Sequence, residues 1–461
     1  MIYRYNNFIS KLLLKFLICS ITMGADLTLS EIYKESAKKI ITAAQENDLG
    51  YQRMEEICYR FGPRLSGSNN LELALDWITE EMIKDGFNHV YSDSVIVPKW
   101  VRGNEQIRLT HPWEKDMAML GLGRSIGTPK NGISGEVMVV SDFAELDSLN
   151  YQIEGKIVLF DVPFTTYGET VKYRYKGADA ASKYGALASM IRSIGDFSMN
   201  TPHTGGMSYS GEAKKIPHSA ITIEDAKLLH WLYNNELKPK VEIIMYAQTL
   251  DSVYSRNLIC ELTGREKPNE IVVLGGHIDS WDTRLGAHDD AGGCVAAWEA
   301  VRIIKELGLR PRRTLRVVLW TNEENGLMGA NSYRKKYLNE LENHVAAMES
   351  DNGVFAPIGI GFTGSDEARL MLNEIVKLLS PINADSVLAS GREADIGPLE
   401  KDGIPLLSLE VNRDRYFWLH HTPADTPEKV DKDEFRNCIA SFAVMAYILA
   451  DMKNPLPRIV N

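Results

Sequence analysis

The pattern of apolar and polar residues predicts alternating strands and helices in much of this 461-residue chain. The apolar run 270–274 precedes a stretch of helical periodicity at 292–307, and the run 314–320 precedes another at 327–338. Alternation of this kind is typical of a largely parallel sheet flanked by helices. The sequence therefore predicts a mixed, largely parallel α/β fold.

The pattern changes between about residues 115 and 249. Short β-like runs, such as 135–140 and 156–160, are separated there by clusters of Gly, Asp and Thr. This block predicts an inserted β-rich domain at 115–249, and the α/β domain is then assembled from 50–114 and 250–461.

The N-terminus has the pattern of a secretory signal peptide. Basic residues precede and enter an apolar run, Leu12 to Met23, which is followed by small residues. The run is too short for a membrane anchor and is interrupted by Lys15, and no later stretch approaches a spanning length. We therefore expect a signal peptide at 1–25 and a secreted or lumenal protein without a membrane span. The polar, helix-prone segment 26–49 is either a removable pro-segment or the first helix.

Charge and cysteine content exclude two classes of function. The formal net charge is −11, from 51 basic and 62 acidic residues, so nucleic acid is not expected as a partner. The cysteines that follow the signal peptide lie far apart and show no CxxC spacing, which indicates neither a cysteine zinc cluster nor a disulfide framework.

Histidines and acids follow one predicted strand after another. Open α/β sheets bind ligands just beyond the carboxyl ends of their strands, where these residues would meet. Imidazoles and carboxylates suit zinc, and a carboxylate shared by two ions would hold them about 3.5 to 4 Å apart. The candidates are His277 and Asp279 after 271–274, Asp289 at the next helix start, Glu323 and Glu324 after 315–320, Asp351 after 345–348, and His420 and His421 after 404–409.

The segments that carry these residues resemble the di-zinc aminopeptidase family, in its carboxypeptidase Q (plasma glutamate carboxypeptidase) branch. They read GGHIDSWD, GAHDDAGG, TNEENG, ESDNG and HHTPADT, and further likeness at 64–68, 97–103, 202–205 and 390–395 extends the resemblance over roughly 50–450. The resemblance implies a zinc exopeptidase fold with a protease-associated-like insert. It also implies a homodimer that hydrolyses dipeptides or short peptides with a free N-terminus and uses two Zn²⁺ ions per chain.

The resemblance also assigns roles to single residues. It implies that His277 and Asp351 hold one zinc, that Glu324 and His421 hold the other, and that Asp289 bridges both. Glu323 is then the general base that takes a proton from water. Asp279 would orient the His277 ring by accepting its other N–H, His420 could reach a substrate oxygen, and the Asp289–Asp290 peptide is expected to be cis.

Other interpretations remain open for this set. Each motif alone could be a surface histidine or a solvated acid, and the zinc interpretation depends on five positions at successive strand ends. A non-catalytic ectodomain of the same fold would lack metal ligands, whereas a single-zinc glutaminyl cyclase would lack the insert. Ser280 follows a His-x-Asp, but no nucleophile-elbow pattern supports a serine triad. Arg392 is a candidate clamp for a substrate carboxylate.

Overall fold

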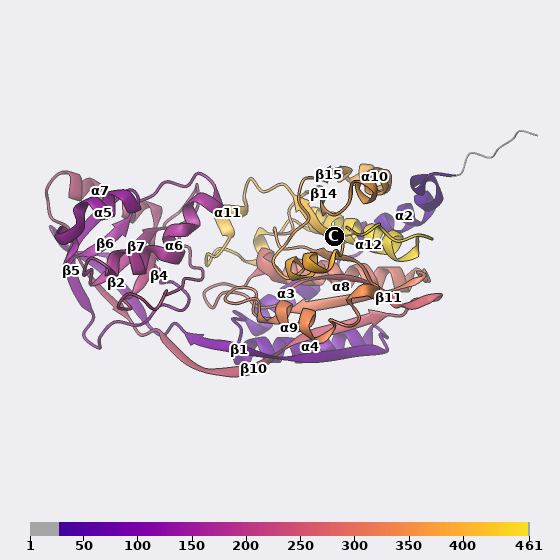
Figure 1. The fold of residues 1–461 in the computed structure, drawn as a ribbon, viewed down its shortest axis with the longest axis horizontal. Helices are drawn as coiled ribbons and strands as arrows, with labels where there is room; N and C mark the ends of the chain where they lie inside the picture. Colours follow the sequence, from indigo (N-terminus) through magenta and orange to yellow (C-terminus); the bar gives the residue numbers. More distant parts are fainter. Residues whose placement is uncertain (1–26, 460–461) are drawn as a thin grey trace, which may run out of the picture.

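The computed structural model describes residues 27–459, so the predicted signal peptide lies outside the described residues. No helix between residues 27 and 459 is both long enough and apolar enough to cross a bilayer. The described chain forms two lobes that lie side by side, each built on its own sheet (Figure 1).

The larger lobe contains an eight-stranded mixed sheet. Its inner strands β12, β11, β13 and β16 run parallel to one another, and β10 and β14 pair antiparallel at either side of them. This confirms the predicted mixed, largely parallel α/β fold. In sheet order the strands are β1 (His89–Val101), β10 (Gln248–Leu262), β12 (Arg313–Trp320), β11 (Lys267–His277), β13 (His344–Glu349), β16 (Leu406–Val411), β14 (Pro357–Thr363) and β15 (Ser386–Leu388).

Helices flank this sheet, and two of them form the centre of the core. The helices α8 and α12 pack against each other and are buried over most of their length, as their nearly continuous apolar sequences require. The helices of this lobe are α2 (Leu29–Gln45), α3 (Leu49–Phe61), α4 (Asn69–Lys84), α8 (Gly292–Glu306), α9 (Met328–Lys336), α10 (Asp366–Ile375), α11 (Tyr416–Leu419) and α12 (Lys432–Asp451).

The segment 26–49, for which the sequence left two interpretations open, contains the helix α2. Thr28 caps its N-terminus in a capping box with Glu31, so the helix start is encoded locally. One face of α2 packs on α12 and buries Tyr33, Ile40 and Ile41 in the main core. Removal of this segment by processing would therefore expose apolar surface.

The smaller lobe is built on a second eight-stranded sheet, in the order β3-β2-β9-β5-β6-β7-β8-β4. The sheet already includes β2, which begins at Glu105, before the expected boundary at residue 115. Helices cover it, and the lobe has apolar clusters of its own. Its strands are β2 (Glu105–His111), β3 (Lys115–Met117), β4 (Met119–Gly121), β5 (Ile133–Val140), β6 (Ile157–Phe160), β7 (Ala188–Arg192), β8 (His218–Ile221) and β9 (Lys240–Met245), and its helices are α5 (Phe143–Leu149), α6 (Tyr167–Ser182) and α7 (Ile223–Asn234).

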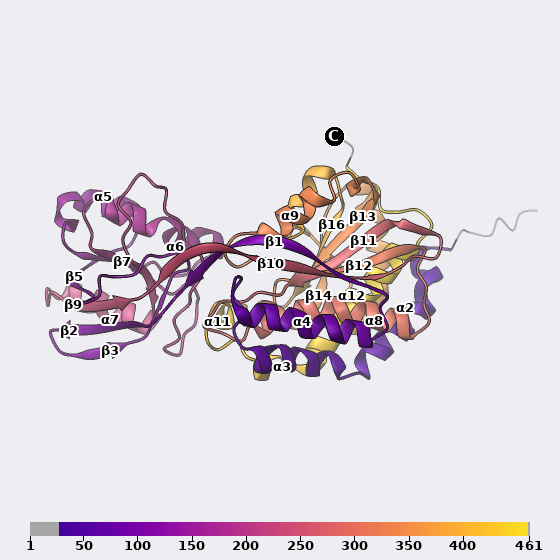
Figure 2. The same ribbon diagram turned by 90° about the horizontal axis from the view of Figure 1, so that it is seen from below.

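A long two-stranded ribbon of β1 and β10 connects the lobes (Figure 2). The two strands pair antiparallel from His89 opposite Glu261 to Val101 opposite Gln248. The strand β1 continues past Pro98. The register shifts between Val97 and Lys99, because a proline cannot donate to the ladder and is accommodated at an irregularity.

Candidate metal and active site

Three parallel strands bring the predicted residues to one edge of the main sheet. His277 is the last residue of β11, the pair Glu323 and Glu324 follows the end of β12, and Asp351 follows β13. The register pairs His277 with Trp320, the last residue of β12, so these strands end side by side. His421 comes from the loop after α11, which lies where the lobes meet (Figure 1).

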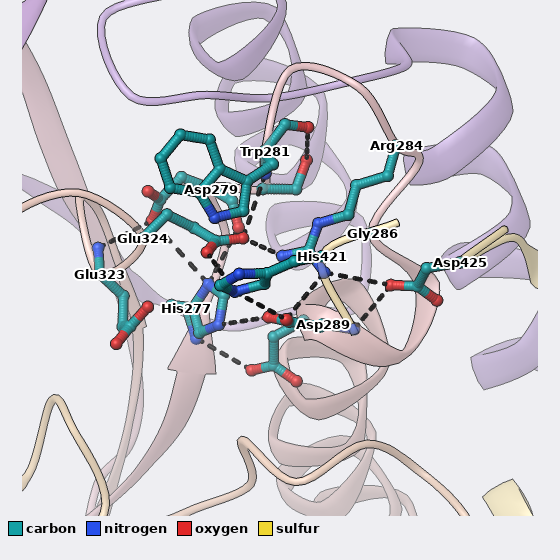
Figure 3. Close-up of polar contacts among 12 residues, drawn as sticks. His277, Asp279, Trp281, Arg284, Gly286, Asp289, Glu323, Glu324, His421 and Asp425 are labelled. Carbon is teal, nitrogen blue, oxygen red and sulfur yellow. Dashed lines mark hydrogen bonds and ion pairs between the residues drawn. The ribbon is translucent and has the colours of Figure 1, made fainter. Parts of the chain in front are cut away.

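The two oxygens of Asp289 face two different imidazoles (Figure 3). His277 Nε2 lies 3.0 Å from Asp289 Oδ1 and 3.1 Å from Asp351 Oδ1. His421 Nε2 lies 3.2 Å from Glu324 Oε2 and 3.7 Å from Asp289 Oδ2. The structure therefore brings all five predicted ligand residues together in two halves. We call His277, Asp351 and Asp289 Oδ1 the His277 half, and we call His421, Glu324 and Asp289 Oδ2 the His421 half.

The backbone around Asp289 departs from a regular helix. Asp289 and Asp290 have non-helical dihedral angles within the segment Ala287–Ala291, and the peptide bond between them is cis, as expected. The carboxylate of Asp290 accepts the N–H groups of His277 and Gly293, each at 3.0 Å. Although Asp290 lies close enough to His277 and Asp351 to count as a further metal donor, its oxygens are thus engaged by the backbone.

The remaining ring nitrogens of both imidazoles face backbone carbonyl groups. His277 Nδ1 lies 2.9 Å from the carbonyl oxygen of Asp279, and His421 Nδ1 lies 3.2 Å from that of Thr204 in the smaller lobe. An N–H that donates to a carbonyl leaves Nε2 with its lone pair, the form that binds a metal.

The expected contact of the Asp279 carboxylate differs in the structure. Asp279 Oδ1 lies 3.9 Å from His277 Nδ1, too far for a hydrogen bond, and instead accepts the backbone N–H of Glu323 at 3.1 Å. Asp279 therefore orients the imidazole through its carbonyl group, while its carboxylate holds the turn that carries Glu323 and Glu324.

Several carboxyl groups are buried close together at the site. Burial raises the pKa of Asp279 to about 7, although the nearby His277 opposes this shift, and it raises the pKa of Glu324 to about 7, although the nearby Arg284 opposes it. Burial also raises the pKa of Glu323 well above its usual value. Buried carboxylates that crowd one another are stabilised by a bound cation. The two imidazoles and the carboxylates therefore fit zinc, both in donor type and in charge.

Arg284 is a component of the site that the sequence analysis did not identify. Its side chain is fully buried, and Nη1 lies 2.7 Å from Asp289 Oδ2 and 3.6 Å from Asp425 Oδ2. Nη2 makes an ion pair with Glu324 Oε1. Although burial opposes its charge, these acids raise the pKa of Arg284, so it stays charged. The only sequence signal is the position of Arg284 in the loop between the His277 and Asp289 motifs.

A cavity of about 500 Å³ lies against both halves, a volume within the range of small-ligand sites. The smaller lobe lines it with Tyr167 and Arg174, and the larger lobe contributes Glu323 among other residues. His420 also lines the cavity and stacks on His421, with the ring centroids 3.7 Å apart. Its ring lies close enough to Asp289 and His421 to be a further donor, in addition to its expected contact with substrate.

The comparisons with known proteins agree with this architecture. The model of "Peptidase family M28" matches residues 257–446. Carboxypeptidase Q of Xenopus laevis is 43% identical over 429 residues, which cover 92% of each chain. Carboxypeptidase Q of Homo sapiens is 42% identical over 425 residues, which cover 92% of this chain and 90% of that protein. These matches extend far beyond the motifs at the strand ends.

Solved structures give the same result. A peptidase M28 precursor from Shewanella amazonensis superposes with a TM-score of 0.89 at 32% identity, covering 94% of this chain and all of that chain. BSAP, a zinc aminopeptidase from Bacillus subtilis, has the same fold with a TM-score of 0.67 at 20% identity, covering 88% of this chain and 96% of its own. The chain therefore belongs to peptidase family M28, in its carboxypeptidase Q branch, and is a metallo-exopeptidase.

Proposed function

We propose that this chain is a secreted or lumenal exopeptidase that hydrolyses dipeptides and short peptides with a free N-terminus and holds two zinc ions. The proposal depends on the position of the Asp289 carboxylate, because one of its oxygens faces His277 and the other faces His421. A carboxylate so placed can bridge two ions. The His277 half and the His421 half would then hold one ion each.

Glu323 is proposed as the general base. It lines the cavity beside both halves, and its backbone is held by the Asp279 carboxylate. Zinc bound in the two halves would lower the pKa of a water molecule and polarise the scissile carbonyl. Glu323 then accepts the proton of the attacking water and passes it to the leaving amine. His420, on the same wall, can donate a hydrogen bond to a substrate oxygen.

The cavity favours recognition of the peptide amine. Its lining includes the carboxyl group of Glu393, which is neither a proposed ligand nor the proposed base, and a free ammonium group can pair with such an acid. The lining also includes Arg124, Arg174 and Arg413. Arg392, the candidate carboxylate clamp, does not line the cavity. Its side chain is 64% exposed and lies 3.3 Å from Glu400. The proposal of cleavage after the first residue therefore depends on Glu393 in the cavity and on the position of Arg392 outside it.

The test compares three forms of one dipeptide with the zinc-loaded protein. We expect the free and C-amidated forms to be cleaved and the N-acetylated form to resist, because acetylation removes the charge that the acids would bind. Protein stripped of metal by a chelator is the control and should cleave none of them. Cleavage of the acetylated form, together with resistance of the amidated form, would instead identify an exopeptidase that recognises the free C-terminal carboxylate.

Secretion and dimerisation are further parts of the proposal. Secretion is supported by the signal pattern at 1–25, and a homodimer is suggested by the branch to which the chain belongs. N-terminal sequencing of protein from a secreting host would locate the cut and decide whether α2 is retained. Sedimentation velocity of the same sample would give the oligomeric state.

A further inference from the structure

Arg284 distinguishes the two halves of the site. Its guanidinium group contacts Asp289 through Oδ2 and Glu324 through Oε1, both of which are ligand residues of the His421 half (Figure 3). No contact of Arg284 with His277, Asp351 or Asp289 Oδ1 is found among the residues that the structure describes. The positive charge therefore acts mainly on one half.

Arg284 cannot act by binding substrate. Its side chain is fully buried, and it is absent from the lining of the cavity. The neighbouring acid Asp425 is also fully buried and accepts the N–H groups of His288 and Asp289 at 2.8 and 3.2 Å. Arg284 is thus enclosed by three acids, and its effect on the reaction has to pass through them.

A fixed guanidinium charge opposes a second cation on the same oxygens. It withdraws electron density from Asp289 Oδ2 and Glu324, and it repels a dication in the low-dielectric interior, where charges interact strongly. The His277 half has Asp351 as its second carboxylate, and Asp351 makes no ion pair with an arginine in the described structure. The same dication is therefore held less tightly in the His421 half.

Without metal, Arg284 has the opposite effect. Asp289, Glu324 and Asp425 are buried close together, and their mutual repulsion would destabilise the fold if no cation were present. The guanidinium group neutralises part of this charge. It can therefore keep the His421 half assembled while no zinc is bound there.

We propose that Arg284 is a built-in counter-ion that makes the two zinc sites unequal, so that the His277 half fills first and the His421 half fills last and empties first. The proposal rests on the two-zinc function proposed above. It adds that the chain passes through a folded one-zinc form, in which Arg284 stands in for the missing cation.

The test is a zinc titration of metal-free protein against a chromophoric chelator, which gives both stepwise dissociation constants. We expect two steps separated by at least about 10-fold, the lower end of the effect that residues behind metal ligands have on affinity. Arg284→Gln should bring the two constants closer together by tightening the weaker step. Arg284→Lys keeps the charge and should keep the steps apart, and His421→Gln should remove the weaker step alone.

Thermal unfolding with and without zinc provides a second readout. Arg284→Gln should lower the melting temperature of the metal-free protein more than that of the zinc-loaded protein, because zinc replaces the lost charge. Arg53→Gln is the matched control. Arg53 is a buried arginine paired with Asp85 and Glu299 outside the site, and its loss should destabilise both forms equally. If a variant is too unstable without metal, it would be purified with zinc and the zinc would then be removed in steps. The measurement is the number of zinc ions that each chain retains at each step.

The outcomes separate the two proposals. Equal constants in the unmodified protein, or an unchanged or widened separation in Arg284→Gln, would overturn the role of Arg284 and leave the two-zinc site intact. Loss of the tighter step in His421→Gln would overturn the order of filling. A total of one zinc or none in every form would instead contradict the proposed two-zinc function.

Discussion

Glu323 and Glu324 are adjacent in the sequence but have different surroundings. Both oxygens of Glu324 have partners. Oε1 accepts the N–H of Trp281 at 3.1 Å and makes an ion pair with Arg284, and Oε2 lies 3.2 Å from His421 Nε2. Glu323 lines the cavity, and within residues 27–459 it is held by its backbone, whose N–H donates to Asp279 and whose carbonyl group accepts the N–H of Gly326. The same side chain can therefore serve as a ligand at one position and as a proton acceptor at the next.

This difference gives a test with an internal control. We expect Glu323→Gln to retain zinc and to lose activity by about 10²- to 10⁴-fold, because the amide keeps the shape of the side chain but cannot accept a proton. The neighbouring variant Glu324→Gln should lose zinc from the His421 half as well as activity. Metal analysis and kcat for a dipeptide measure the two effects. Near-normal turnover by Glu323→Gln would contradict its role as the base.

At the scale of a single element, the strand β8 begins with a titratable residue. His218 is fully buried, with Nδ1 2.8 Å from Ser189 Oγ and Nε2 3.3 Å from the carbonyl oxygen of Tyr173. Burial lowers the pKa of His218 from 6.5 to about 4, although the surrounding carbonyl groups oppose this. The folded state therefore keeps this ring neutral at a pH where the unfolded chain is protonated.

We expect the smaller lobe to lose stability in mild acid. In the unfolded state His218 binds a proton below about pH 6.5, whereas in the folded state it does so only near pH 4. The stability that depends on His218 is therefore complete above pH 6.5 and is lost as the pH falls to 4. The loss amounts to about 3 kcal/mol. His218→Gln should make the dependence of unfolding free energy on pH less steep between 6.5 and 4, and the same substitution at the exposed His89 is the control.

At the scale of the whole molecule, Arg102 ties the two lobes together beside the site. It lies in the connection between β1 and β2, and its Nη2 lies 2.6 Å from Asp282 of the larger lobe and 3.2 Å from Thr204 Oγ1 of the smaller lobe. The carbonyl group of Thr204 in turn faces the His421 ring. The smaller lobe thus helps to orient a candidate ligand on the larger one.

Arg102→Gln should therefore weaken both the fold and the site. Removing one partner of a largely buried ion pair costs up to about 3 kcal/mol, with some reduction here because Asp282 is partly exposed. The matched control is Arg108→Gln, because the pair of Arg108 with Glu114 is exposed and should contribute less than about 1 kcal/mol. Denaturant unfolding measures both changes. Equal stability of the two variants would contradict a role for Arg102 in joining the lobes.

The sequence by itself determined the main sheet and the set of residues that meet at its edge. Strand periodicity identified β11, β12 and β13, and parallel strands end at a common edge, so His277, Glu324 and Asp351 had to lie close together. His421 and Asp289 were found through motifs that are contiguous in the chain. Local sequence was sufficient wherever the chemistry and the strand end occur within a few residues.

Only the tertiary structure decided the contacts between segments that are far apart in the chain. Nothing near Arg284 in the sequence places its guanidinium group between Asp289, Glu324 and Asp425, because Asp425 comes from a loop near the C-terminus. The carbonyl group of Thr204 faces His421 across the lobe boundary for the same reason. These contacts depend on how whole elements pack, and packing is a property of the folded chain that no local pattern of residues records.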